Sequence, residues 1–286
     1  MLGEVAVWQT HKPNSEMNEK RDYMNIAILY ICTGLYKQFW RGFYESAEKF
    51  FLDGKARKEY FVFTDDMDLC HDERVHLYYR ECQGFPFDSL FRFDLFLSIK
   101  DQLGGGKFDY VYFFNANMQF VKPVGEELLP TEEDGGLAAV LHPLVLRRPF
   151  WFYPYERNKK SQAYVPLVRN HEYHYYMGSL NGGRTKEYLA LVEACAKNTR
   201  VDFDKGIIAK VHDESHLNRY LFDHKCKALP ASFAYPEGRD MGYEPVILIR
   251  DKVKVNAYFN KGRDTSAWGK MKMVCSWIYN AWLWIT

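Results

Sequence analysis

Hydrophobic and polar positions divide this chain into strand-like and helix-like segments. Strands are predicted where apolar residues run almost without interruption, at 25–31, 60–63, 110–114 and 137–141, and the first is expected to be buried on both faces. Helices are predicted from apolar residues at helical spacing at 37–51 and 90–103, and also at 186–197 and 212–222. Two further strand candidates are 173–179 and 245–250. Because strands and helices alternate through 25–140, the pattern indicates an α/β fold with a mostly parallel central sheet.

Polar side chains follow several predicted strands at their carboxyl ends. Cys32 and Thr33 come after the first strand, Asn115-Ala116-Asn117 after the third, and His142 after the fourth. A parallel sheet of this kind binds its ligands beyond the carboxyl ends of its strands. We therefore expect these three segments to meet at one site.

The 286 residues are predicted to form one domain, residues 24–260, between two terminal segments. Residues 1–23 are mixed-polar and predict a flexible arm. Residues 261–286 are basic and then strongly aromatic; they are too short to span a membrane but could lie in a membrane interface. Inside the domain, residues 144–172 are basic, aromatic and proline-containing, which is typical of a long functional loop.

Composition argues against several classes of protein. A formal net charge of +1 argues against general electrostatic capture of nucleic acid. The six cysteines form no C-x-x-C pair, which indicates reduced thiols rather than a zinc site or a disulfide framework. We find no signal peptide and no apolar run of about 20 residues. These features predict a cytoplasmic protein that is at most peripheral, at the inner face of a membrane.

Two amides, one residue apart, follow the third predicted strand. Asn115 and Asn117 follow the strand-like run Tyr-Val-Tyr-Phe-Phe at 110–114. An amide oxygen is neutral and is a weaker ligand for a hard cation than a carboxylate. Taken alone, the pair is also compatible with a polar turn after a strand.

The densest chemical cluster is His-Asp-Glu-Ser-His at 212–216. Asp213 or Ser215 could cap a helix, with Glu214 as a first-turn carboxylate favoured by the helix dipole. A second interpretation is a buried carboxylate that faces the anomeric carbon of a sugar, where positive charge develops. A zinc site on His212 and His216 is a weaker hypothesis, because a third ligand is not evident.

Two basic residues are candidates for the charges of a diphosphate. Arg92 lies on the predicted helix 90–103, and Lys252 follows the last predicted strand. Without a metal, side chains of this type must neutralise a leaving diphosphate. Either could equally be a solvated surface charge. The chain has no G-x-G-x-x-G, no Walker loop and no G-x-S-x-G elbow.

Several segments together resemble glycosyltransferase family 6, which contains the histo-blood-group A/B transferases and the α1,3-galactosyltransferase. The most specific segment is His-Asp-Glu-Ser-His-Leu-Asn-Arg-Tyr at 212–220. The others are 43–48, 60–65, 110–117, 141–143, 155–157, 161–166, 175–179 and 182–183. The resemblance covers about 25–255.

The resemblance implies a GT-A fold, a single Rossmann-like domain with a mixed, mostly parallel sheet. It implies retaining α1,3 transfer of galactose or N-acetylgalactosamine from a UDP-sugar to a galactoside, which we expect to be fucosylated and carried by an oligosaccharide or glycolipid. The exchange of aspartate for asparagine at 115 and 117 is similar to the bacterial branch of the family, which works without a metal. No cofactor is therefore expected, and the net charge of +1 predicts no nucleic acid partner.

The resemblance also assigns roles by position. Glu214 matches the catalytic carboxylate, and Asp213 matches its neighbour that contacts the donor sugar. His142 and Glu237 match acceptor-binding residues. The segment predicted to select the donor sugar is Met177, Gly178 and Ser179. The residues predicted to bind the donor are Ile31, Cys32, Thr33, Tyr36, Arg92, Asn115, Ala116, Asn117 and Lys252.

Three departures from the family pattern leave the substrates open. Val211 stands where the family has a tryptophan that packs on the acceptor, and Pro154 replaces a hydroxyl residue. Met177 and Ser179 together favour galactose, because a bulkier third side chain should crowd an acetamido group. The alternative function is a non-catalytic protein that binds sugar nucleotides or glycans on the same fold, against which the intact acid pair argues. A metal-dependent hydrolase is the third hypothesis.

Overall fold

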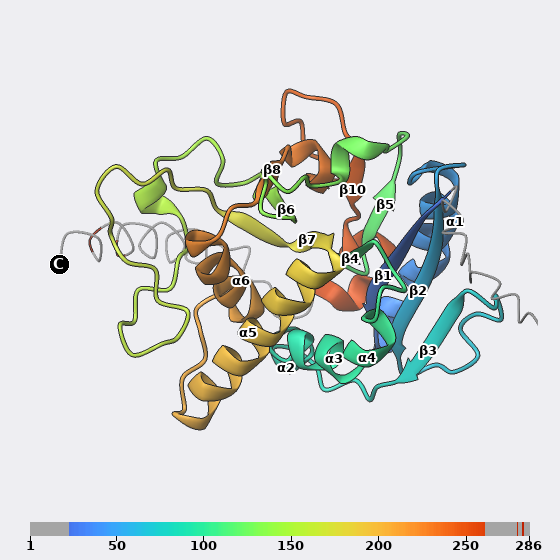
Figure 1. Ribbon diagram of the computed structural model, residues 1–286, viewed down its shortest axis with the longest axis horizontal. Coiled ribbons are helices and arrows are strands. Elements are labelled where there is room, and N and C mark those ends of the chain that lie inside the picture. The colour runs from blue at the N-terminus through green and yellow to red at the C-terminus, as the bar shows by residue number, and fades with distance from the viewer. Residues whose placement is uncertain (1–22, 261–278, 280–281, 283–286) are drawn as a thin grey trace, which may run out of the picture.

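The structure, a computed structural model, describes residues 23–260 together with Tyr279 and Trp282 (Figure 1). Apart from Tyr23, Tyr279 and Trp282, the predicted arm at 1–23 and the predicted tail at 261–286 lie outside the described residues. No helix in the described part of the chain combines the length and the apolar character needed to cross a membrane.

A seven-stranded mixed sheet forms the centre of the molecule, in the order β3-β2-β1-β4-β7-β6-β8. Its strands are β1 Met24–Cys32, β2 Ala56–Thr64, β3 Val75–Tyr79, β4 Tyr110–Phe114, β6 Leu137–Leu141, β7 Tyr176–Arg184 and β8 Lys227–Leu229. All neighbours pair in parallel except β7, which runs antiparallel to both β4 and β6. The prediction of a mixed, mostly parallel sheet is therefore confirmed.

Helices cover both faces of this sheet, and the alternation of residues along β1 shows how. Ile26, Ile28 and Tyr30 pack toward α1 Trp40–Phe50, which follows the 3₁₀ helix η1 Gly34–Phe39. Ala27 and Leu29 pack toward the other face. That face is covered by α3 Arg92–Ser98, α4 Lys100–Leu103, α5 Thr185–Asp204 and α6 His212–Asp223 (Figure 1).

A second, small sheet has the order β5-β10-β9. Its strands are β5 Met118–Phe120, β9 Tyr235–Pro236 and β10 Ile247–Ile249. It brings the late segment around β10 back to the residues that follow β4. The remaining short elements are α2 Phe87–Leu90, α7 Lys252–Val255, η2 Glu126–Leu128, η3 Phe150–Phe152, η4 Ala231–Ala234 and η5 Ala257–Asn260.

Most predicted elements are confirmed, and the exceptions have local causes. The strands at 110–114 and 137–141 match β4 and β6 residue for residue. The continuous helix predicted at 90–103 is wrong, because the backbone leaves helical geometry at Phe91 and Ile99. The strand expected at 173–179 begins later and is β7. Strands β3, β5, β8 and β9 were not predicted.

Candidate active site

The predicted strand ends meet at one edge of the central sheet. Thr33 follows β1, Asn115 follows β4 and His142 follows β6, so all three leave the sheet at its carboxyl edge. Since β7 runs the opposite way, it enters the sheet at this same edge, with its first residues beyond the end of β4. The donor-selecting segment predicted at 177–179 therefore lies beside the end of β4.

Glu214, in the first turn of α6, is held by both of its carboxylate oxygens. Oε1 accepts a hydrogen bond from the hydroxyl of Tyr175 at 2.7 Å, and Oε2 accepts one from the backbone N–H of Gly178 at 2.7 Å. Burial raises the pKa of Glu214 above its ordinary value, and these two donors oppose the rise. The carboxylate is thus fixed in position in a desolvated setting, as a group that stabilises positive charge requires.

Asp213 is paired with a buried cation. Arg92 Nη1 lies 2.9 Å from Asp213 Oδ2 and also donates to the carbonyl oxygen of Gly178 at 2.6 Å. The guanidinium stacks 4.2 Å from the ring of Phe113. Burial raises the pKa of Asp213 to about 6, although Arg92 acts to lower it. Arg92 is only 7% exposed, so the structure directs its charge at Asp213; contact with a diphosphate stays a prediction.

The predicted side-chain cap from Asp213 or Ser215 is wrong, whereas Glu214 does lie in the first turn of α6, as that interpretation expects. The cap position of α6 is Val211, and no side chain accepts the cap hydrogen bond. Ser215 Oγ instead accepts from the backbone N–H of Val211 at 2.9 Å. His212, which opens the helix, has a φ of 47°, a left-handed backbone that is uncommon outside glycine. The two carboxylates are therefore free of a capping role.

Gly178 is the point where the strand and the carboxylates meet. A Cβ at this position would lie 3.4 Å from both Asp213 Oδ2 and Glu214 Oε2, so even the smallest side chain here would be in contact with both carboxylates. Its neighbour Ser179 accepts a backbone hydrogen bond from Asn115 at 2.8 Å. The segment predicted to select the donor sugar thus contacts both the acid pair and the amide pair.

The amide pair is tied into the protein. Asn115 Nδ2 donates to Asn117 Oδ1 at 3.0 Å, and Asn117 Nδ2 donates to the carbonyl oxygen of Arg250 at 2.8 Å. The backbone N–H of Arg250 returns a bond to Asn117 O at 2.7 Å. Asn117 is buried, whereas Asn115 is partly exposed. Asn117 therefore anchors the segment after β10 at the site, and the more open of the two amides is Asn115.

A cavity of about 430 Å³ collects residues that lie far apart in the sequence. Of the residues with a predicted role, it is lined by Tyr36, Asn117, His142, Met177, Glu237 and Lys252. Lys252 Nζ donates to the hydroxyl of Tyr36 at 2.8 Å and lies 4.8 Å from the centre of its ring. No described carboxylate forms an ion pair with Lys252.

The two predicted acceptor residues have opposite electrostatic settings in this cavity. Burial lowers the pKa of His142 to about 4, so the ring is neutral, and Nδ1 accepts from Leu144 N at 3.2 Å. Burial acts to raise the pKa of Glu237, but the hydrogen bond from Asp251 N and the pair with Arg250 outweigh it and lower the pKa. The cavity thus offers a neutral ring and an ionised carboxylate.

Among the other residues predicted to bind the donor, Cys32 and Ala116 form hydrogen bonds through their backbone carbonyl oxygens. Cys32 is buried, its carbonyl oxygen accepts from Thr64 at 3.0 Å, and burial raises the pKa of its thiol to about 12. Ala116 is buried and its carbonyl oxygen accepts from Tyr30 at 2.7 Å. Thr33 is buried, and Ile31 is partly exposed. Their roles in donor binding stay predictions.

Two further residues position Glu214 and were not predicted. Tyr175 supplies the hydroxyl described above. Asn218, one turn beyond Glu214 on α6, donates from Nδ2 to Tyr176 O at 2.8 Å and to Glu214 O at 2.9 Å. Its Oδ1 accepts from Tyr176 N at 2.8 Å. A polar residue four positions after Glu214 was the available signal, because this spacing places both on one helix face.

The zinc hypothesis finds no support in the described residues. His216 is buried 3.8 Å from Asp202, whereas the ring of His212 contacts that of Phe85 at 4.8 Å. Across the described part of the chain, no three histidine, cysteine, aspartate or glutamate side chains converge to hold a metal.

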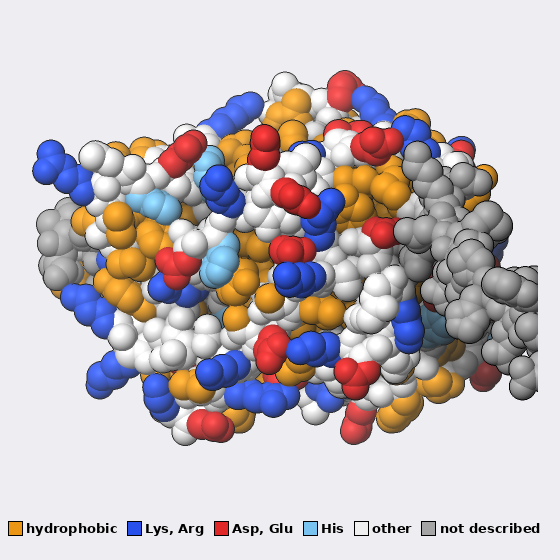
Figure 2. Space-filling model, in the orientation of Figure 1, with side chains coloured by type: hydrophobic (Ala, Val, Ile, Leu, Met, Phe, Trp, Pro, Cys, Tyr) orange, Lys and Arg blue, Asp and Glu red, His pale blue; other side chains and the backbone are white. Residues whose placement is uncertain are grey.

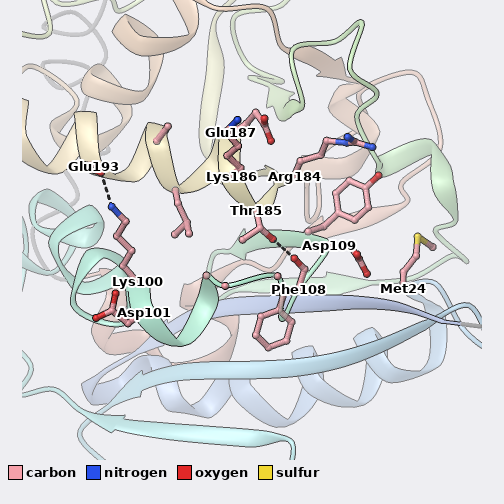
Figure 3. A pocket seen from close by; sticks show the side chains of 16 residues that line it. Met24, Lys100, Asp101, Phe108, Asp109, Arg184, Thr185, Lys186, Glu187 and Glu193 are labelled. Carbon is pink, nitrogen blue, oxygen red and sulfur yellow. Dashed lines mark hydrogen bonds and ion pairs between the residues drawn. The ribbon is translucent and has the colours of Figure 1, made fainter. Parts of the chain in front are cut away.

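A larger cavity, of about 1130 Å³, lies at the opposite edge of the sheet (Figure 3). Met24 and Tyr110, at the starts of β1 and β4, line it together with the first turn of α5. Figure 3 shows two of its polar groups already bonded within the protein, Lys100 to Glu193 and Thr185 to Phe108. It holds none of the predicted site residues, so the smaller cavity at the carboxyl edge is the better candidate.

Comparison with known proteins places this arrangement in a family. The model of glycosyltransferase family 6 matches residues 15–248. The chain is 36% identical over 239 residues to the O-antigen biosynthesis glycosyltransferase WbnI of Escherichia coli, covering 83% of this chain and 99% of that protein. It is 32% identical over 228 residues to histo-blood group ABO system transferase 2 of Rattus norvegicus, covering 77% of this chain and 66% of the relative.

A third relative is globoside alpha-1,3-N-acetylgalactosaminyltransferase 1 of Gallus gallus, 27% identical over 221 residues, or 75% of this chain and 61% of the relative. The mixed, mostly parallel sheet is that expected of a GT-A glycosyltransferase fold, and the family match extends through the acid pair on α6. The chain belongs to glycosyltransferase family 6.

Proposed function

We propose that this protein is a retaining glycosyltransferase that moves galactose or N-acetylgalactosamine from a UDP-sugar, in α1,3 linkage, to a fucosylated galactoside. The observation that supports this best is the setting of Glu214. Its carboxylate is partly buried, held at both oxygens and placed against Gly178, at the sheet edge where the donor-selecting segment begins. Two relatives are named for the ABO system and for α1,3 transfer of N-acetylgalactosamine, which agrees with this class of reaction.

Glu214 is the group proposed to act on the sugar. When the bond between the anomeric carbon and the phosphate oxygen breaks, UDP leaves with the electron pair and positive charge develops on the sugar. Glu214 would stabilise that charge or attack the carbon from the face opposite UDP. The 3-hydroxyl of the acceptor then adds from the face that UDP left, and its proton passes to the departing phosphate oxygen. Where Glu214 has bonded to the carbon, this addition breaks that bond and Glu214 leaves again as a carboxylate.

Lys252 and Tyr36 are proposed to receive the diphosphate. Their side chains are hydrogen-bonded to each other and line the same cavity as Met177. A lysine ammonium is a point charge that binds phosphate oxygens, and no described carboxylate forms an ion pair with Lys252. Arg92 supports the donor site indirectly in this proposal, because its charge holds Asp213.

The residues at the position of the family's metal site fit a divalent cation poorly, so we propose transfer without a metal. Asn117 Oδ1 already accepts from Asn115, and the Asn117 amide nitrogen is bonded to Arg250 O. No carboxylate replaces them at these two positions, and hard cations prefer several charged oxygen ligands. The donor would instead meet the amide of Asn115.

The acceptor is proposed to lie against His142 and Glu237, which line the same cavity. The pair Met177 and Ser179 favours galactose over N-acetylgalactosamine. The C-terminal aromatic tail is proposed to give the enzyme peripheral contact with a membrane. Of that tail, the structure describes Tyr279 and Trp282, whose exposed rings stack 5.9 Å apart.

One experiment tests the catalytic proposal against a non-catalytic sugar-nucleotide-binding protein. Purified parent protein, Glu214→Gln and the exposed control Glu45→Gln are incubated with UDP-galactose or UDP-N-acetylgalactosamine. Plain and fucosylated lactose serve as acceptors, EDTA is present, and UDP binding is measured separately. We expect the parent and Glu45→Gln to transfer sugar. Glu214→Gln should bind UDP normally but lose transfer by several orders of magnitude.

Three results would count against the proposal. UDP binding by the parent without any transfer would favour the non-catalytic function. Near-normal turnover by Glu214→Gln would remove that residue from the chemistry. Activity that disappears in EDTA and returns with manganese would overturn the metal-independent mechanism alone.

A further inference from the structure

The loop 144–172, which leaves the site directly after His142, exposes an unusual number of large apolar side chains. Each of these is 40–54% exposed: Leu144, Leu146, Trp151, Leu167 and Val168. Single exposed apolar residues are ordinary on a protein surface, but several on one segment mark an interaction site. The donor and acceptor cavity does not need most of them, because of the five only Leu144 lines it.

The same loop concentrates positive charge. It contains six basic and two acidic residues, a net charge of +4. The segment 261–286 has four basic residues and one acidic residue, a net of +3, so the remainder of the chain has a net charge of −6. One of the two loop carboxylates, Glu156, is buried and accepts from Asn158 N and Lys210 N. The overall charge of +1 therefore conceals a strongly basic segment beside the site.

The loop presents these side chains on an ordered base. Tyr153, Tyr155, Val165, Tyr173 and Tyr175 form a buried cluster beneath it. The hydroxyl of Tyr173 accepts from Val168 N at 2.7 Å, and its ring stacks on Phe150 at 4.3 Å, next to Trp151. Trp151, through Phe150, and Val168, through Tyr173, are thus both attached to this tyrosine cluster. The cluster also contains Tyr175, which donates to Glu214.

The loop begins next to His142, one of the proposed acceptor residues. In Figure 1 it forms the left-hand end of the molecule, and Figure 2 shows hydrophobic side chains at that end with lysine and arginine side chains around them. Leu144 belongs to both surfaces, since it lines the cavity and is exposed. A surface bound to this loop would therefore lie next to the opening of the acceptor site.

We propose that loop 144–172 is a docking surface for an anionic lipid bilayer. Leu and Trp side chains suit the boundary between headgroups and acyl chains, while lysine and arginine suit anionic headgroups. A nucleic acid or an acidic peptide would account for the charge but not for the exposed leucines and tryptophan. The chain's own tail is an unsuitable occupant, because its net charge has the same sign. The inference does not depend on which sugar is transferred.

Charge reversal tests the contribution of the basic residues of the loop to bilayer binding. Lys159 and Lys160 are exposed and form no ion pair with a described residue. The full chain and Lys159→Glu/Lys160→Glu are sedimented with vesicles of phosphatidylglycerol mixed into phosphatidylcholine, and with phosphatidylcholine alone. The control Lys107→Glu/Lys186→Glu makes the same change in net charge at exposed positions on the opposite edge of the sheet. We expect the parent and the control to bind anionic vesicles equally well. Each lysine charge lost near an anionic surface should weaken binding about fivefold, so the loop variant, which loses two, should bind at least about 25-fold more weakly.

The variant Trp151→Ala/Leu167→Ser tests the contribution of the exposed apolar side chains to bilayer binding. It should also weaken vesicle binding while leaving retention on a heparin column unchanged. Transfer to a soluble lactose acceptor should be unaffected in the lysine variant, because neither lysine lies in the cavity. Equal vesicle binding by the loop variant and the parent, which would assign binding to the tail, overturns the proposal. So does a parent that binds heparin but no anionic vesicle, since that result identifies a polyanion site.

Discussion

Removing the hydroxyl of Tyr175 tests how the site prepares Glu214. In Tyr175→Phe the ring remains in its buried cluster with Tyr153 and Tyr155, and the lost group is the donor 2.7 Å from Glu214 Oε1. Gly178 N still donates to Oε2. The substitution therefore removes one of the two hydrogen bonds that favour the ionised carboxylate, with little change in packing.

The expected shift has a definite sign. A hydrogen bond to a charged group contributes about 1.5–3 kcal/mol, and one pKa unit corresponds to about 1.4 kcal/mol. Burial already raises the pKa of Glu214, and the Tyr175 hydroxyl opposes that rise. Its loss should therefore raise the pKa further, by an amount set by the free energy of the lost hydrogen bond. Since the proposed chemistry needs the ionised form, the acid limb of the rate profile should move to higher pH.

The assay is kcat for sugar transfer measured from about pH 5 to about pH 9, at saturating donor and acceptor. The matched control is Tyr155→Phe, which removes a hydroxyl from the same cluster that donates to His174 O rather than to Glu214. Tyr175→Phe should also lower the plateau about tenfold, because one oxygen of Glu214 is no longer held. An acid limb that stays in place in Tyr175→Phe, or moves equally in both variants, would refute the reasoning.

Two further expectations concern the donor site and stability. Lys252→Met should weaken UDP binding about ten- to hundredfold by calorimetry, as expected for the loss of a charged bond to phosphate, whereas Lys254→Met should have little effect. Burial lowers the pKa of His216 to about 4, below its ordinary 6.5, so the unfolded state takes up the proton first as pH falls. Stability should therefore be lost between about pH 6.5 and 4, by about 3 kcal/mol. Urea titrations of His216→Gln should show a smaller loss, and an unchanged loss would contradict this assignment.

The sheet could be predicted from the sequence because its strands are long apolar runs with clear ends. β4 and β6 are buried on both faces and are followed by polar residues, so their bounds are visible in the pattern. The breaks at Phe91 and Ile99 could not be predicted, since neither a glycine nor a proline marks them. β5, β8 and β9 have three residues or fewer, which is too short for a periodic signal.

The site could be predicted as a location more readily than as a set of contacts. Strand ends and the acid pair identify the edge of the sheet, because parallel strands share one carboxyl edge. The sequence does not show that Arg92 meets Asp213, because the two are far apart in the chain and either could have had another partner. It also does not show that Asn117 turns inward to Arg250. Such choices depend on packing between elements.

The partner of Arg92 decides which of the two carboxylates can act on a sugar. Burial raises the pKa of Asp213 to about 6 even with the guanidinium 2.9 Å away, so without this partner the group would be protonated near neutral pH. The pair is neutral as a whole and cannot contribute much field to a developing cation. Glu214 has neutral donors on both oxygens and no described cation in an ion pair with it. Arg92 attracts the Glu214 carboxylate without forming an ion pair with it, so the negative charge of Glu214 is less compensated than that of Asp213. This difference supports the proposal that Glu214, rather than Asp213, stabilises positive charge at the anomeric carbon.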